Sequence, residues 1–255
     1  MIRARLSDAK FFFDQDRLRP LADRLTALQS VIYHNKIGSQ AERVARLEKL
    51  AGQFAQAVGV NASDAERAAR LAKADLATDM VGEFPELQGV MGQYYALHDG
   101  ESAEVAKAIE GHYHPRFAGD SLASNGLGLA VALADKTELL VGIWGIGLSP
   151  TGEKDPFGLR RAALGLLRML IETPITLTLT ELLATGQKSF EGVNSVKQQA
   201  EAIHSFLLYR ARGYLKDQGH GVDAIEAVLA ECPDKPWQWL PRVCKMILAS
   251  LHILR

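Results

Sequence analysis

The sequence predicts a mainly α protein, and three observations support this prediction. Apolar residues recur every three or four positions along most of the chain, as they do on one face of an α-helix. Several of these stretches begin with residues that cap helix N-termini and end near glycine or proline. Strand-like stretches do not alternate with helical ones, as they would in a parallel sheet protein.

Two capping signals stand in the first third of the chain. Ser39 and Glu42 have the spacing of a capping box, and the helical run after them stops at Gly59. Ser63 has the same capping-box spacing, with a glutamate three residues later. We therefore expect a second helix that begins at Ser63 and continues through Met80.

Three further helices follow. Ser102 can cap the stretch "AEVAKAIEGHY". Asn125 precedes a long apolar stretch that predicts a buried helix carrying Asp135. Asp155 and Pro156 supply an N-cap and a first-turn proline for "FGLRRAALGLLRMLIE".

The helical pattern weakens between Thr173 and Thr180, where threonines and alternating apolar residues appear. We place a domain boundary at this point. The chain should thus hold a multi-helix domain at residues 1–172 and a smaller helical region at residues 173–255. Gly219 and Pro233 are the breaks that we expect within the second part.

Composition limits the classes of function. The 29 basic and 30 acidic side chains leave a formal net charge of -1, so only a local basic patch could contact a nucleic acid, and we expect no DNA partner. The longest apolar runs are too short to cross a bilayer, which argues against a membrane partner. Cys232 and Cys244 follow no secretory signal, and we expect reduced thiols in a cytoplasmic protein.

Histidines and aspartates form a candidate metal site. In "EGHYHPRFAGDSL", His112 and His114 are two positions apart, so they can share an ion only if the helix ends between or near them. His34, Asp75 and Asp135 lie on other predicted elements that a helical fold could bring together. Such a set suits a divalent-metal hydrolase. The competing interpretation is that His112 and His114 are ordinary helix-end residues.

A basic edge marks the predicted helix after Pro156. It consists of Lys154, Arg160, Arg161 and Arg168, and Arg161 and Arg168 share a face because they are seven residues apart. Such an edge can hold RNA phosphates, although arginines on the outside of an amphipathic helix are often only solvated.

The sequence offers no catalytic motif. "GLSPTGEK" has two suitably spaced glycines, but it lacks the Lys and Ser or Thr of a phosphate-binding loop. No Ser-His-Asp, zinc-ribbon or catalytic-cysteine pattern is present. We therefore assign no catalytic residue and no cofactor to this chain.

Four stretches in order resemble one family. They are "ARLSDAKFFFDQDRLRPLADRLTALQSVIYHNKIGSQAERVARLEKLA", "KADLATDMVGEFPELQGVMGQYYALHDGE", "GHYHPRFAGDSL" and "KDPFGLRRAALGLLRML". They are similar to the middle portion of the β subunit of bacterial tetrameric glycyl-tRNA synthetase, over most of residues 4–172. Residues 196–255 resemble its next helical region, with looser motifs.

This resemblance implies a function and partners. The family attaches glycine to its tRNA in an ATP-dependent reaction that uses magnesium, and glycine activation takes place on a separate α subunit. We therefore expect a chain that is not catalytic alone and whose partners are tRNA(Gly) and the α subunit. The β subunits are considerably longer, so we expect a fragment with a truncated start at Met1 and without the C-terminal anticodon-binding domain.

The resemblance also implies an HD-like fold, since this part of the β subunit is similar to helical metal phosphohydrolases of the HD superfamily. Their pattern is a His, a His-Asp pair and a later Asp, which His34, Ala74-Asp75 and Asp135 match with one alanine in place of a metal-binding histidine. The resemblance therefore implies a vestigial site, with His112 and His114 nearby, that holds no metal. The alternatives are a residual phosphohydrolase and a purely structural spacer.

Overall fold

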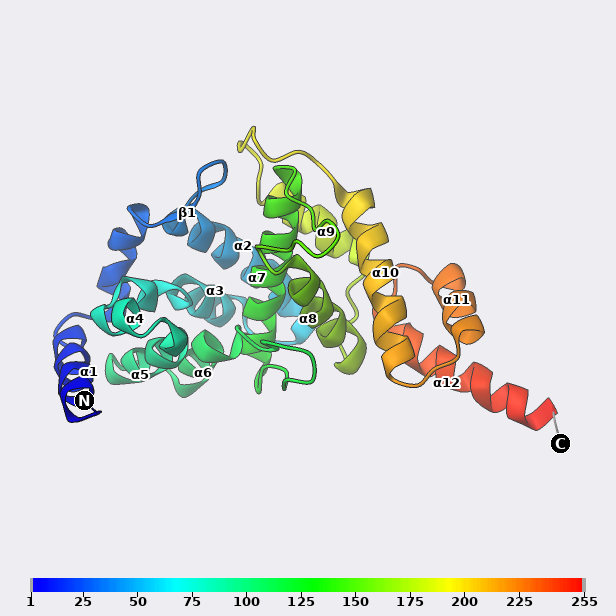
Figure 1. Ribbon diagram of the computed structural model, residues 1–255, viewed down its shortest axis with the longest axis horizontal. Helices are drawn as coiled ribbons and strands as arrows, with labels where there is room; N and C mark the ends of the chain where they lie inside the picture. The colour runs from blue at the N-terminus through cyan, green and yellow to red at the C-terminus, as the bar shows by residue number, and fades with distance from the viewer. Residues whose placement is uncertain (1, 254–255) are drawn as a thin grey trace. The chain divides into compact units, whose positions relative to one another are not determined.

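The computed structural model describes the backbone of residues 2–253 and the side chains of residues 8–246. Helices dominate this part of the chain, and its named strands are the short antiparallel pair β1 (Ile32–His34) and β2 (Gly38–Ser39). The prediction of a mainly α fold is therefore confirmed (Figure 1). In the described part no helix is long and apolar enough to cross a membrane.

The chain forms two compact units. Unit 1 holds the residues up to Pro115 together with Ser121–Asp135, and unit 2 holds Arg116–Asp120 and the residues from Lys136 onward. The domain division between residues 172 and 173 stays a prediction.

Unit 1 is built from helices, short turns of 3-10 helix and the hairpin. In Figure 1, α2 lies beside α3 and α5 lies beside α6. The elements other than β1 and β2 are α1 (Ile2–Asp16), η1 (Leu21–Gln29), α2 (Gln40–Val58), α3 (Ala62–Leu71), η2 (Ala74–Ala77), α4 (Asp79–Glu83), η3 (Pro85–Leu87), α5 (Val90–His98), α6 (Ala103–Gly111) and the first part of α7 (Gly126–Gly145).

Helix α2 confirms the first capping prediction. The Ser39 side chain accepts a hydrogen bond from the backbone N–H of Glu42, and the Glu42 carboxylate accepts one from the backbone N–H of Ser39. The helix ends at Gly59, whose φ of 78° is left-handed and favours glycine. Leu47, Leu50 and other apolar side chains of this helix are fully buried and form part of the core.

The prediction of one helix from Ser63 through Met80 is wrong about both of its ends. Asn61 is the N-cap, because its side-chain oxygen accepts hydrogen bonds from the two N–H groups that follow Ala62. Helix α3 ends at Leu71, and the chain continues as η2 and α4. Thr78 caps α4, and the buried Asp16 accepts its first N–H groups, so a polar side chain far away in the sequence helps to start this separate helix.

Helices α6 and α7 start where the sequence predicts. The Ser102 side chain accepts the N–H of Val105, and the Asn125 side chain accepts the N–H of Gly128. Helix α7 is buried along most of its length and carries Asp135, as expected.

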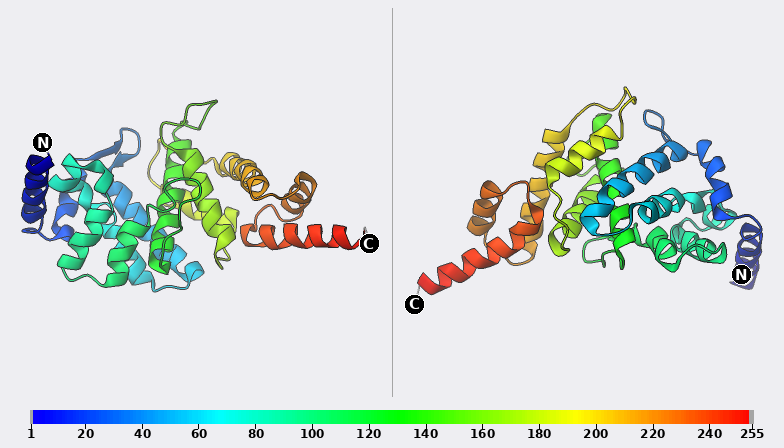
Figure 2. Two further views of the ribbon diagram at one scale, coloured as in Figure 1. Left: turned by 60° about the horizontal axis from the view of Figure 1, so that its bottom comes forward. Right: turned by 180° about the vertical axis from the view of Figure 1, so that it is seen from behind.

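Unit 2 contains the remaining helices. They are the later part of α7, α8 (Leu159–Glu172), α9 (Leu179–Lys188), α10 (Ala200–Asp217), α11 (Val222–Glu231) and α12 (Pro236–Ile253). In Figure 2, α10, α11 and the start of α12 gather at the orange to red end of the chain. Leu166, Leu207 and Trp239 are fully buried in this unit. Cys232 and Cys244 are free thiols.

The start of α8 corrects another prediction. The helix begins at Leu159 after Gly158, not directly after Asp155 and Pro156. Asp155 still serves the helix, because its two carboxylate oxygens accept the N–H groups of Leu159 and Arg160 at 2.8 and 2.9 Å. A turn closed by Gly158, with a φ of 68°, lies between the acid and the helix.

Candidate functional site

A buried charged cluster lies in unit 1 where the sequence predicts an HD-like site. At its centre is the ammonium group of Lys73, whose side chain is almost fully buried. Lys73 Nζ lies 2.7 Å from His112 Nε2 and 3.1 Å from Asp135 Oδ1. Arg43 approaches the same Asp135 oxygen at 3.0 Å. The structure thus brings His112 and Asp135 together, with a lysine between them.

The hydrogen bonds of His112 indicate which of its two ring nitrogens carries the proton. Its Nδ1 lies 2.6 Å from the backbone carbonyl of Ile109, which can only accept, so Nδ1 carries the proton. Nε2 then has a lone pair and accepts from the Lys73 ammonium group, which can only donate. Burial lowers the pKa of Lys73, and the carboxylate of Asp135 opposes this effect.

Aromatic rings cover both cations of the cluster. Lys73 Nζ lies 4.1 Å from the centre of the Tyr113 ring. The guanidinium carbon of Arg43 lies 4.2 Å from the centre of the Tyr33 ring. The negative faces of these rings favour positive charge in a space from which water is largely excluded.

Asp75 is fully buried, but its carboxylate supports a neighbouring helix. Oδ2 accepts the N–H groups of Gly89 and Gly92 at 2.6 and 3.2 Å, at the start of α5. Burial raises the pKa of Asp75, while these two backbone donors act in the opposite direction. Oδ1 has no hydrogen-bond partner among the described residues. A Cβ added at Gly92 would lie 3.1 Å from Asp75 Oδ2 and 2.7 Å from Ile109 Cγ2, so the glycine makes room for the acid.

The other two predicted histidines make local contacts. His34 Nδ1 accepts the N–H of Lys36 within the turn between β1 and β2. His114 Nε2 lies 2.9 Å from a carboxylate oxygen of Glu110, one helical turn earlier. In the part of the chain that the structure describes, no three His, Cys, Asp or Glu side chains form a group that could hold a metal ion.

These residues do not fit the metal of an HD-type site. Ala74 occupies the position at which the pattern has its second histidine, so one metal ligand is missing. The lone pair of His112 Nε2 is already directed at Lys73. Oδ2 of Asp75 is engaged by backbone donors. The sequence pattern did not single out Lys73 and Arg43, although a lysine directly beside the substituted Ala74 was a signal that could have been used.

The predicted basic edge in unit 2 divides into exposed and engaged residues. Lys154 and Arg161 are exposed, and Arg160 is half-buried with its guanidinium group bonded to the Gly152 carbonyl. Arg168 is largely buried instead: its side chain is 12% exposed and bonds both oxygens of Glu172 and the carbonyl of Asp120. The structure therefore leaves Arg168 least available to a ligand.

Arg210 is a cation that the sequence pattern did not single out. It lines a pocket of about 430 Å³ together with Arg168, Glu172 and Tyr214. Its Nε is buried and has no hydrogen-bond partner among the described residues. Its position on α10, beside the engaged Arg168, could not be inferred from one helix alone.

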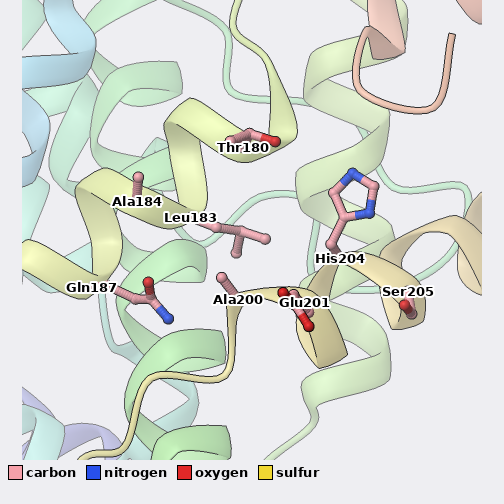
Figure 3. Close-up of a pocket in the computed structure, with 8 residues that line it drawn as sticks. All are labelled: Thr180, Leu183, Ala184, Gln187, Ala200, Glu201, His204 and Ser205. Atoms are coloured by element: carbon pink, nitrogen blue, oxygen red, sulfur yellow. The ribbon is translucent and has the colours of Figure 1, made fainter.

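A second pocket of about 430 Å³ lies between α9 and α10 (Figure 3). Thr180 and Leu183 face it from one helix, and His204 faces it from the other. His204 Nε2 lies 3.5 Å from Asp234 Oδ1, which also accepts two hydrogen bonds from Thr180. Its lining includes no lysine or arginine, so this pocket is a weaker candidate for an RNA contact than the start of α8.

Comparison with known proteins adds the family. The sequence model described as "Glycyl-tRNA synthetase beta subunit" matches residues 1–230. The glycine–tRNA ligase β subunit of Ralstonia nicotianae is 59% identical over 235 residues, which cover 92% of this chain and 34% of that protein. The β subunits of Aromatoleum aromaticum and Neisseria meningitidis serogroup C are each 56% identical, over 92% and 91% of this chain and 34% of each relative. The chain spans about a third of the length of these curated relatives, and it belongs to the family of glycyl-tRNA synthetase β subunits.

Proposed function

We propose that this chain supports the binding of tRNA(Gly) within a glycine–tRNA ligase, in which ATP-dependent attachment of glycine takes place with the α subunit. The observation that carries this proposal is the family match over residues 1–230. ATP and magnesium are used by the α/β holoenzyme, and this chain has no catalytic residue of its own. The ligase works in the cytoplasm, where its tRNA is found.

The start of α8 is the surface that best suits an RNA backbone. Lys154 and Arg161 are exposed there, and Arg160 adds a third positive charge beside them. Positive side chains that neutralise phosphates release counterions, so such binding weakens as salt rises. Arg168 acts in the protein interior in this proposal, because Glu172 already holds its guanidinium group.

The phosphohydrolase alternative receives no support from the geometry. Its chemistry would need His34, His112, His114, Asp75 and Asp135 to act around an ion. Lys73 stands between His112 and Asp135, and Asp75 is bound to the start of α5. The spacer alternative becomes one outcome of the experiment below.

The test is a binding titration of labelled tRNA(Gly) with the 255-residue chain at several salt concentrations. A tRNA for another amino acid serves as the competitor. The variants are Lys154→Ala and Arg161→Ala, and Lys107→Ala on α6 is the matched control, because this lysine is also exposed. Each substitution that removes a bond to a phosphate should flatten the plot of log K against log salt by somewhat under one unit.

We expect both variants to bind more weakly and with a flatter salt dependence, and the control to match the unaltered chain. Unchanged binding in both variants would remove the start of α8 from the RNA surface. No binding of tRNA(Gly) by any form would favour the spacer. Formation of glycyl-adenylate by this chain without the α subunit would contradict the division of labour.

A further inference from the structure

Lys73 has an environment that is unusual for a lysine. Its side chain is 4% exposed, although lysine is among the residues that are least often buried. The chain nevertheless directs an imidazole nitrogen, a carboxylate oxygen and an aromatic face at this one ammonium group. Two segments supply these groups: Asp135 comes from α7, and His112 and Tyr113 are the two residues that directly follow α6.

The groups that contact Lys73 are of the types that bind metal ions in proteins. A neutral imidazole nitrogen and a carboxylate oxygen are common ligands of divalent metals, and the backbone bond at His112 Nδ1 is the usual way in which such a ligand is oriented. The ammonium group has the same sign of charge as a metal ion. In the sequence, Lys73 directly precedes Ala74, the position at which the HD pattern has a metal-binding histidine.

The ammonium group and a metal ion cannot use His112 together. Nε2 has a single lone pair, and Lys73 Nζ lies 2.7 Å from it. A zinc ion bound to that nitrogen would lie about 2.0–2.1 Å away along the same direction and would overlap with the ammonium group. Occupation by Lys73 therefore excludes occupation by a metal.

We propose that the ammonium group of Lys73 has replaced the metal ion of an HD-type site, as a covalently attached cation that holds His112 and Asp135 together without any metal. The cluster is then a structural centre of unit 1. This inference is independent of the proposed tRNA binding, and it concerns how the region keeps its fold after the loss of a metal ligand.

The first part of the test measures stability in the full chain. Lys73→Met keeps the length of the side chain but removes its charge and its donors, so His112 Nε2 loses the Lys73 donor while Asp135 keeps the ion pair with Arg43. Loss of one partner of a buried ion pair should increase the equilibrium constant of unfolding by a factor of between about a hundred and several thousand. Lys107→Ala on α6 is the control and should leave the constant within about threefold of the original.

The second part measures the response to zinc. Lys73→Ala opens space beside His112 Nε2 and Asp135, so excess zinc should raise the melting temperature of this variant. Zinc should not stabilise the unaltered chain. The double variant with Lys73→Ala and His112→Ala should lose the response, which links the effect to this cluster.

A third measurement needs no substitution. Nitrogen NMR of the histidines should show His112 protonated at Nδ1 only, with signals that excess zinc does not move. The inference is overturned by a zinc-dependent shift of the His112 signals in the unaltered chain. It is equally overturned if Lys73→Met is as stable as the control, or if a folded Lys73→Ala variant gains nothing from zinc.

Discussion

Arg168 donates two hydrogen bonds to Glu172 across one turn of α8, from Nε to Oε1 at 2.6 Å and from Nη2 to Oε2 at 3.2 Å. Tyr214 on α10 donates a third hydrogen bond to Glu172 at 2.8 Å. The remaining nitrogen of Arg168 bonds to the carbonyl of Asp120. The pair therefore joins α8, α10 and the segment Arg116–Asp120 within unit 2.

Arg168→Ala should destabilise the chain more than Arg161→Ala does. Removal of Arg168 leaves Glu172 and a backbone carbonyl without a charged donor, and we expect a loss of about 1–3 kcal/mol in the free energy of unfolding. Arg161 is exposed, and its loss should stay within about 0.5 kcal/mol. Urea denaturation of both variants measures the difference. Equal losses would contradict a structural role for Arg168.

The same pair should make stability depend on acid pH. Burial acts to raise the pKa of Glu172, but the hydrogen bonds from Arg168 and Tyr214 outweigh it and hold the pKa below its ordinary value of 4.5. Because the pKa is lower in the folded chain, the carboxylate contributes stability above pH 4.5 and loses it as the pH falls through the folded-state pKa.

Glu172→Gln should therefore reduce the loss of stability between neutral pH and about pH 3, while it lowers the stability at neutral pH. Glu201→Gln, on the exposed side of α10, is the matched control and should keep the original pH dependence. Urea midpoints over this range give the comparison. An unaltered pH dependence in Glu172→Gln would show that other acids dominate.

Asp16 should be among the acids whose loss costs unit 1 most stability. Its carboxylate is buried and receives hydrogen bonds from Asp79, Met80 and Tyr95, and it pairs with Arg24 at 3.1 Å. Asp16→Ala leaves these donors without an acceptor and should cost about 3–5 kcal/mol, as breaking a buried ion pair does.

Two controls separate the parts of this effect. Tyr95→Phe removes one donor and should cost only about 1 kcal/mol. Asp14→Ala removes an acid on the same helix whose side chain is 48% exposed, and should change stability by less than about 0.5 kcal/mol. Thermal or urea unfolding of the three variants gives the order. An Asp16→Ala variant as stable as Asp14→Ala would contradict the assignment.

Local interactions were predictable from the sequence. The capping box at Ser39 and the N-cap at Ser102 join residues three positions apart, so the sequence contains the whole interaction. Asp155 was a partial success: its carboxylate reaches the helix across a turn that glycine makes possible. The pairing of Arg168 with Glu172 also has a readable signal, because the residues are four positions apart, but the helical pattern alone placed that arginine on the outside.

Interactions between distant segments were not predictable. The break before α4 depends on Asp16, which lies far from it in the sequence and meets it only in the fold. The same holds for Lys73 with Asp135: its place beside Ala74 was a signal in the family pattern, but only the fold shows that this lysine, in the turn after α3, is buried against an acid on α7. The family resemblance implied that His112 and Asp135 lie near one another, and they do. It did not indicate that Lys73 lies between them.

Position 92 limits how this region can change over evolutionary time. Any side chain there would collide with Ile109 and crowd the carboxylate of Asp75, so both neighbours constrain this position. A smaller residue at 75 alone would leave the collision with Ile109 in place. In an alignment of relatives, column 92 should therefore covary with columns 75 and 109, with alanine or serine at 92 tolerated mainly where both of these residues have become smaller.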